Sequence, residues 1–197
     1  MPTPIGHALA GAALAFAAWP IARPIALPKT RSQADAPAAG IGLKTIDTEW
    51  ALPALLAGLA AAPDLDLLFQ THRTATHSFV STAFIIILAR LVTGKVTASS
   101  GDAWRLAVLC GAAWGSHVLL DWMGADTNRP RGVQALWPFH DRWFISDWDV
   151  FRRVERRNPF SSETMTSNLK AVVQEIAIMV PVAMAAWWIS RRRSRYA

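Results

Sequence analysis

The sequence predicts an all-α integral membrane protein: a bundle of about four to five transmembrane or half-inserted helices, with an ordered polar loop segment between the last two. Of its 197 residues, 52% are hydrophobic and 17% are charged, whereas about 25% of a typical soluble domain is charged. Ten tryptophans stand against one tyrosine, and tryptophan concentrates at membrane–water interfaces. This composition excludes a disordered or fibrous chain.

Apolar runs predict the helices. In order, they cover residues 5–21, 50–62, 79–92, 104–122 and 169–189. A membrane-spanning helix needs about 20 apolar residues, with about 17 as a lower bound. The first, fourth and fifth runs reach this length. The second and third are shorter, so we expect them to be tilted, half-inserted, or extended by the polar segments beside them.

The segments between the runs are expected to belong to one domain over residues 1–197. Residues 23–47 are rich in proline, alanine and small polar side chains, which predicts a loop insertion. Residues 123–168 are polar but contain bulky aromatics, which indicates an ordered extramembrane segment. Residues 191–197 form a basic tail.

The single cysteine and the net charge narrow the choice of cofactors and partners. One cysteine, Cys110, allows neither an intrachain disulfide nor a cysteine metal cluster. A formal charge of +6 suits either nucleic acid or an anionic membrane surface. The hydrophobicity favours membrane lipids as partners, and no nucleic acid is expected. The oligomeric state stays open.

Polar chemistry gathers at one end of the predicted bundle. When the five helices alternate through a bilayer, every histidine falls on the same side. Ionisable groups at membrane depth are costly and usually functional. The residues on that side are His7, Asp64, Asp66, His72, His77, His117, Asp121 and, in the following loop, His140.

Two short motifs carry the carboxylates. His117 and Asp121 are four residues apart, so they share one side of a helix and can reach one ion; a local helix-ending pair is the plainer alternative. In Pro63-Asp64-Leu65-Asp66 the proline ends a helix and both carboxylates can point toward one site. An ordinary acidic turn would have the same pattern.

A third motif, His72 to Ser78, contains two histidines, an arginine and three hydroxyl groups. Thr76 or Ser78 can cap the following helix. Arg73 can pair with Asp64 or Asp66, or it can bind a phosphate group through two hydrogen bonds. We favour phosphate recognition.

Together these residues predict a metal centre. Imidazole and carboxylate ligands suit zinc first, with manganese or iron as alternatives. The set is larger than one tetrahedral ion needs, so we expect one or two divalent ions. The expected ligands are His7, Asp64, Asp66, His72, His77, His117 and Asp121.

The chain resembles a known family at this point, the membrane-bound metal-dependent hydrolases described as LexA-regulated inner-membrane proteins. The matching pieces run in order through nearly the whole chain. The resemblance implies a helical hydrolase of the bacterial inner membrane, with the matched histidines and aspartates as metal ligands. A more distant likeness joins it to zinc-dependent phospholipases C and single-strand nucleases. The pieces are His7, Pro63-Asp64-Leu65-Asp66, His72-Arg73-x-x-Thr76-His77-Ser78, His117-x-x-x-Asp121, Leu136-Trp137-Pro138-Phe139 and Asp147-Trp148-Asp149.

The leading hypothesis is a phosphoesterase that acts through metal-activated water on a lipid or lipid-linked phosphoester. Asp64, Asp66 and Arg73 are the expected catalytic residues. Arg73, Arg129 and Arg142 are expected to bind the substrate.

Two other hypotheses compete with the hydrolase. One is a non-catalytic membrane metal carrier or sensor, which should place polar groups through the membrane midplane rather than at one end. The other is a structural protein whose histidines make only interfacial contacts. Slightly more basic residues lie on the side without histidines. Because basic residues are retained in the cytoplasm, we expect the site to face the extracytoplasmic side.

Overall fold

The computed structural model describes residues 1–18, 48–69, 72–97, 99–156 and 158–195. Five α-helices and two short 3₁₀ segments make up most of this part of the chain. The helices are α1 (Pro4–Ala18), α2 (Thr48–Ala61), α3 (Phe79–Val96), α4 (Ser100–Met123) and α5 (Ser162–Arg195), with η2 (Ala62–Phe69) and η3 (Ala75–His77) between α2 and α3.

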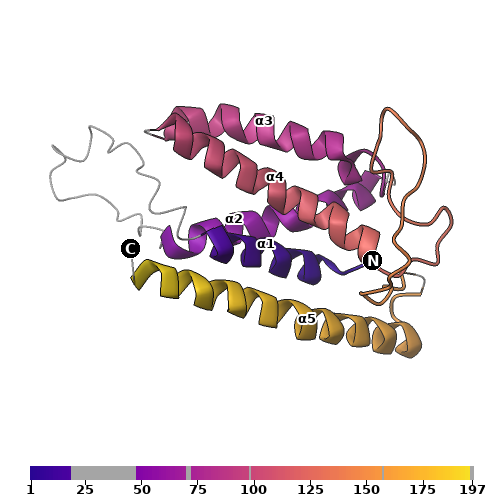
Figure 1. Cartoon of the computed structure of the whole chain (residues 1–197). Helices are drawn as coiled ribbons and strands as arrows, with labels where there is room; N and C mark the ends of the chain where they lie inside the picture. Colours follow the sequence, from indigo (N-terminus) through magenta and orange to yellow (C-terminus); the bar gives the residue numbers. More distant parts are fainter. Residues whose placement is uncertain (19–47, 70–71, 98, 157, 196–197) are drawn as a thin grey trace, which may run out of the picture.

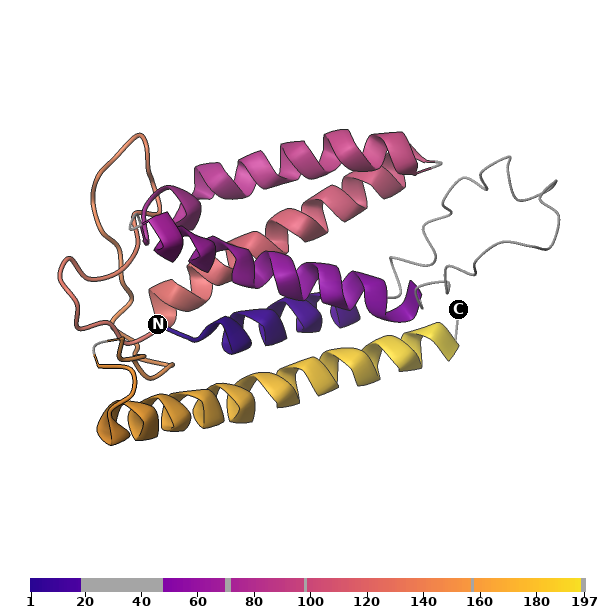
Figure 2. The same ribbon diagram turned by 180° about the vertical axis from the view of Figure 1, so that it is seen from behind.

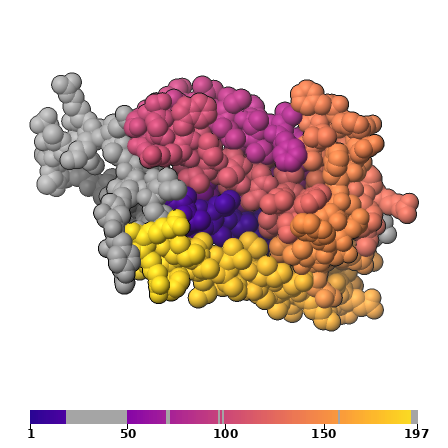
Figure 3. All heavy atoms as spheres, in the orientation of Figure 1, coloured from indigo at the N-terminus to yellow at the C-terminus, as the bar shows by residue number. Residues whose placement is uncertain are grey.

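The helices lie side by side along one direction (Figures 1 and 2). Helix α1 packs against α2, α4 and α5, and α3 packs against α4. The N-terminus and the loop between α4 and α5 lie at one end of the bundle, and the C-terminus lies at the other. Figure 3 shows that α1 is largely covered, visible only between α5 and the α3–α4 pair. The all-α fold is therefore confirmed.

Three helical stretches are long and apolar enough to cross a membrane, and they agree with the predicted runs in part. The second run was predicted to be short and tilted, half-inserted, or extended by the polar segment beside it, and η2 extends it to Trp50–Phe69. Ser100–Met123 and Ser162–Arg193 confirm the fourth and fifth runs. Helix α1 is a shorter apolar helix as far as Ala18, and the predicted insertion at 23–47 lies outside the described residues.

The predicted start of the last helix was wrong. Helix α5 begins at Ser162, seven residues before the apolar run that we used to place it. Its first turns are polar, so hydropathy alone misses them. Glu163 lies in the first turn, where a carboxylate interacts favourably with the helix dipole. The segment between α4 and α5 is therefore 124–161, and two isolated β-bridges, Gly124–Phe151 and Val133–Phe144, form within it.

The bundle has small residues inside and large apolar residues outside. On α3, Phe84, Ile87 and Leu91 are each about 60% exposed, and similar side chains cover α5. By contrast, the buried hydrophobic positions of α1 are all alanines. A soluble protein rarely exposes so large an apolar surface, whereas lipid chains cover one at no cost. The arrangement is that of a membrane protein.

Close backbone contacts hold α1 in the centre. A side chain added at Gly11 would place its Cβ 2.2 Å from the Leu56 carbonyl oxygen, so only glycine lets α1 approach α2 this closely. Small residues at helix contacts are typical of membrane bundles. On the other side of α1, the buried Glu175 of α5 accepts hydrogen bonds from the Thr3 amide (2.8 Å) and the Thr3 hydroxyl. These contacts fix the N-terminal end of α1, which carries His7.

Candidate metal centre

Four chain segments bring their polar side chains to the loop end of the bundle. Helix α1 supplies His7, η2 supplies Asp64 and Asp66, η3 ends at His77, and α4 supplies His117 and Asp121 near its end. These six side chains are all buried, with exposed fractions between 0% and 8%. The predicted gathering of histidines and aspartates at one end is therefore present in the structure. The 3₁₀ winding of η2 after Pro63 keeps both aspartates inside.

The centre of the cluster is a pair of histidine nitrogens that face each other. The Nε2 atoms of His77 and His117 are 2.9 Å apart. Nδ1 of His117 lies 2.8 Å from the Ala60 carbonyl oxygen, which can only accept, so that nitrogen carries the proton. Nε2 of His117 is therefore a lone pair.

The same reasoning applies to His77. Its Nδ1 lies 2.9 Å from the Thr76 hydroxyl and 3.2 Å from Asp66 Oδ2. The Thr76 hydroxyl donates its own proton to Asp66 at 2.5 Å, so Nδ1 of His77 is the donor, and in the neutral ring Nε2 again carries a lone pair. Two lone pairs at 2.9 Å repel each other unless a cation or a proton lies beside them.

Two carboxylates complete the ring around these nitrogens. Asp121 Oδ2 is 3.3 Å from Nε2 of His77 and 3.5 Å from Nε2 of His117. Asp64 Oδ1 is 3.7 Å from Nε2 of His117 and 4.0 Å from Nε2 of His77. Ligands about 2.0–2.2 Å from one tetrahedral ion lie about 3.3–3.6 Å from each other. Asp121 Oδ2 is at about this distance from both nitrogens, whereas the two nitrogens are closer together and Asp64 Oδ1 is farther away. Donor atoms of His77, His117 and Asp121 lie within 4.8 Å of one another, so these three could hold one ion.

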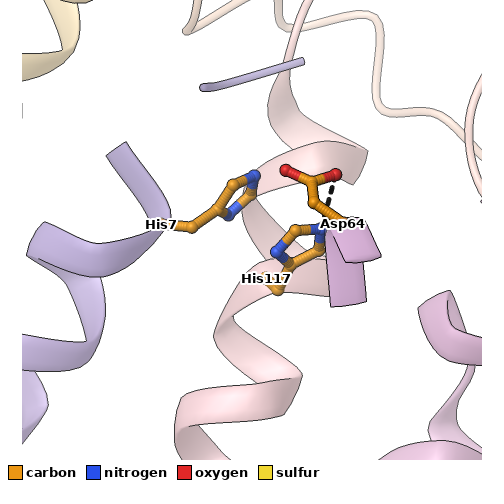
Figure 4. Close-up of side chains that lie close together, drawn as sticks. All are labelled: His7, Asp64 and His117. Atoms are coloured by element: carbon orange, nitrogen blue, oxygen red, sulfur yellow. Dashed lines mark ion pairs between the residues drawn. The ribbon is translucent and has the colours of Figure 1, made fainter. Parts of the chain in front are cut away.

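His7 lies beside this group on the other side of Asp121. Its ring stacks on His117 with the centroids 3.6 Å apart, and its Nε2 is 3.3 Å from Asp121 Oδ1. Figure 4 shows His7, Asp64 and His117 approaching one another from three separate elements, with the Asp64–His117 ion pair dashed. The two oxygens of Asp121 thus face different histidines, as a bridging carboxylate would.

Unpaired polar atoms mark the same place. Both ring nitrogens of His7, Oδ2 of Asp64 and both oxygens of Asp121 are buried without a hydrogen-bond partner. Among the described residues, the one other such side-chain atom is Nε of Arg90. A buried polar atom without a partner costs about 1–3 kcal/mol, and coordination of one or two cations would satisfy both oxygens of Asp121 and one ring nitrogen of His7. Imidazole and carboxylate donors suit zinc, manganese or iron, so the residues present fit the predicted ion.

Asp66 differs from Asp64 in its partners. It accepts hydrogen bonds from His72 Nδ1 at 2.8 Å and from the Arg73 amide at 3.2 Å, besides those from Thr76 and His77. With its oxygens occupied in this way, Asp66 orients the two histidines. His72 lies at the edge of the cluster, with Nδ1 3.9 Å from Asp64 Oδ1.

The carboxylates favour positive charge at His77. Burial alone lowers the pKa of this histidine, but hydrogen bonds to Asp121 and Asp66 outweigh burial and raise the pKa to about 9. A proton or a metal cation can supply that charge.

Arg73 does not have the ion pair that we considered for it. Its side chain pairs with Asp126 of the loop after α4, while only its amide contacts Asp66. Its guanidinium carbon lies 5.4 Å from the centre of the Trp143 ring. Asp126 was missed in the sequence because it belongs to no spaced motif and is brought to Arg73 only by the fold of the loop.

A polar pocket of about 230 Å³ opens beside His72 and Arg73. Loop residues form its other walls, and among the described arginines it includes Arg153 and Arg156. Arg129 and Arg142, the other expected substrate-binding residues, are exposed on the loop and are not among the residues that line this pocket. His140 is also exposed, with Nδ1 3.5 Å from Asp141, apart from the cluster.

Comparison with known proteins gives one match. The family model described as YdjM inner membrane protein matches residues 1–195. No curated protein and no solved structure is significantly similar to the chain.

Proposed function

The chain belongs to the YdjM inner membrane protein family, and we propose that it is a membrane-bound metal-dependent hydrolase. The observation that carries this proposal is the pair of facing imidazole nitrogens, 2.9 Å apart, beside buried carboxylate oxygens of Asp64 and Asp121 that have no hydrogen-bond partner.

In this proposal some residues of the cluster hold an ion, and others position the residues that hold it. His77, His117, Asp121 and Oδ1 of Asp64 would hold the first ion, with zinc preferred and manganese or iron as alternatives. A bound divalent cation supplies a Lewis acid and activates water for attack on an ester. His7 and Oδ1 of Asp121 are the donors available to a second ion.

Asp66 and Asp64 have separate roles in this proposal. Asp66 holds the Nδ1 proton of His77 and so keeps Nε2 directed at the ion, the usual task of a carboxylate behind a metal-binding histidine. Asp64 Oδ2 is buried without a hydrogen-bond partner, so it is the group that we expect to accept a proton from water.

The proposed substrate is a phosphoester of a lipid or of a lipid-linked molecule. Two features support this choice. The cluster lies at the end of a membrane bundle, and the segment that carries Asp64 and Asp66 continues into Leu68 and Phe69, which are 77% and 76% exposed. These side chains suit the membrane interface, where lipid headgroups lie.

We expect the C-terminus in the cytoplasm and the cluster on the extracytoplasmic side, because arginines 191–193 lie at the C-terminal end of the last candidate membrane helix and positive charge is retained inside. A green fluorescent protein fused to the C-terminus should then fluoresce in bacterial cells. A dark fusion, expressed at the same level and inserted in the membrane, would reverse the orientation.

The hydrolase is tested with full-length protein in detergent, loaded with zinc or manganese. Release of phosphate or of a headgroup from short-chain phospholipids should stop on chelation, and it should be lost in His117→Ala. His140→Ala changes an exposed histidine outside the cluster and should keep the activity. Metal-loaded protein that hydrolyses no phosphoester would contradict the proposal and favour a metal carrier or sensor. Equal rates in His117→Ala and wild type would exclude the cluster as the active site.

A further inference from the structure

The pocket beside the cluster combines arginines with one apolar edge. His72 and Arg73 form its inner wall, so it borders the side chains around Asp66. Arg153 and Arg156 come from the segment before α5. Leu67, also on the wall, is followed by the exposed Leu68 and Phe69. The remaining lining residues are Met1, Ala125, Asp126, Thr127, Asn128, Val154 and Glu155.

The two carboxylates of this pocket are already engaged by protein groups. Asp126 accepts from the amides of Asn128 and Gly132, both at 2.9 Å, and from Arg73. Its charge is therefore balanced within the wall, and it holds the Arg73 guanidinium in place.

Glu155 is engaged in the same way. It accepts from the Arg156 amide at 3.1 Å and pairs with Arg153 at 3.5 Å. Arg153 in turn donates to the Thr127 hydroxyl at 2.6 Å. A guanidinium has five N–H donors, so a single pairing leaves donors for a ligand.

We propose that this pocket binds the phosphate-bearing headgroup of a lipid, held by Arg73, Arg153 and Arg156, with the acyl chains leaving past Leu67 toward Leu68 and Phe69. Guanidinium groups match phosphate oxygens in charge and geometry. The apolar edge gives the reason to choose a lipid over a free phosphoester. That the bound lipid is also hydrolysed rests on the proposed function. That the lipid binds here rests on the pocket alone.

The proposal predicts that phosphate recognition can be removed without removing the metal. The protein is purified in full length in a non-ionic detergent and depleted of metal, so that no turnover occurs. Binding of dihexanoyl phosphatidic acid and of glycerol 3-phosphate is then measured by calorimetry. Arg153→Ala/Arg156→Ala should weaken binding of the short-chain lipid by about tenfold or more, because charged hydrogen bonds are lost.

Controls separate this result from unfolding and from failure of the metal centre. Arg192→Ala/Arg193→Ala removes the same charge at the opposite end of the bundle and should leave binding unchanged. After reloading, both double variants should hold as much metal as the wild type. Arg156→Glu serves as a second variant that leaves Arg153 and its contact with Thr127 in place, and it should weaken binding as well.

Each outcome has a separate meaning. Equal lipid affinity in wild type and Arg153→Ala/Arg156→Ala would overturn the pocket. Equal affinity of the wild type for phosphatidic acid and glycerol 3-phosphate would overturn the lipid part of the proposal. Lipid binding that depends on the arginines in a protein that never retains metal would support the pocket while contradicting the hydrolase.

Discussion

In His77 and His117, the hydrogen-bond partner of Nδ1 decides which ring nitrogen carries the proton. The Ala60 carbonyl fixes the proton of His117, and Asp66 together with Thr76 fixes that of His77. In the neutral imidazoles, these contacts leave a lone pair on each of the two Nε2 atoms that face each other. The metal-binding character of the site therefore depends on residues that are not themselves ligands.

Asp66→Asn tests that dependence. Asparagine keeps the size of the side chain but replaces one acceptor oxygen with an NH₂ group, so it cannot accept from His72, Thr76 and His77 together. Loss of a carboxylate behind a ligating histidine lowers metal affinity by about 10–100-fold, and competition with a chelating dye would measure it. Asp141→Asn, at a side chain that is 99% exposed, is the matched control. Unchanged affinity in Asp66→Asn would contradict the positioning role.

The ligand candidates could be predicted from the sequence, whereas the neighbours of Arg73 could not. Histidine and aspartate carry their chemistry in the residue type, and the alternation of apolar runs was enough to place them at one end. Asp126 has no such signal, since the turn at Gly132 (φ +92°) that shapes its loop leaves no periodic pattern. The choice between Asp64 and Asp66 likewise needed their hydrogen bonds.

At the scale of the elements, glycine contacts decide how closely the helices pack. Gly11 of α1 faces the backbone of α2 at Leu56, while an added Cβ at Gly58 of α2 would meet nothing within 4 Å. The two glycines thus lie on neighbouring helices in opposite surroundings.

Gly11→Ala should therefore lower the stability of the bundle by about 1–3 kcal/mol, the cost of overpacking. Gly58→Ala should cause no loss, and it can gain up to about 1 kcal/mol from better helix propensity. Thermal unfolding of both variants in one detergent would measure the difference. Equal melting temperatures would mean that α1 and α2 do not pack as closely as described.

The helix boundaries show where hydropathy stops being informative. It located all five helices because each contains an apolar run, although among the described residues three helical stretches are long and apolar enough to cross a membrane. It missed the polar first turns of α5, and for the second run it left open the extension that η2 provides. In both places helical backbone extends into polar sequence, where capping and packing decide the structure rather than lipid.

At the scale of the whole molecule, the bundle encloses polar groups and exposes apolar ones. Lipid covers the large side chains of α3 and α5, so the buried centre is left for small residues and for the histidines and aspartates. These buried polar groups lie at one end of the molecule, beside the loop between α4 and α5 (Figure 1). Their burial there has an unfavourable free energy. A bound cation would offset that cost, and this is the central claim to be tested.

The most direct test is elemental analysis of detergent-purified wild type beside the His117→Ala/Asp121→Ala double variant, with His140→Ala as the control. We predict one or two equivalents of zinc, manganese or iron in the wild type and in His140→Ala, and none in the double variant. The double variant should still elute as a folded protein in size-exclusion chromatography. Wild-type protein that holds no metal even after reconstitution, or a double variant that keeps its full metal content, would contradict the metal centre.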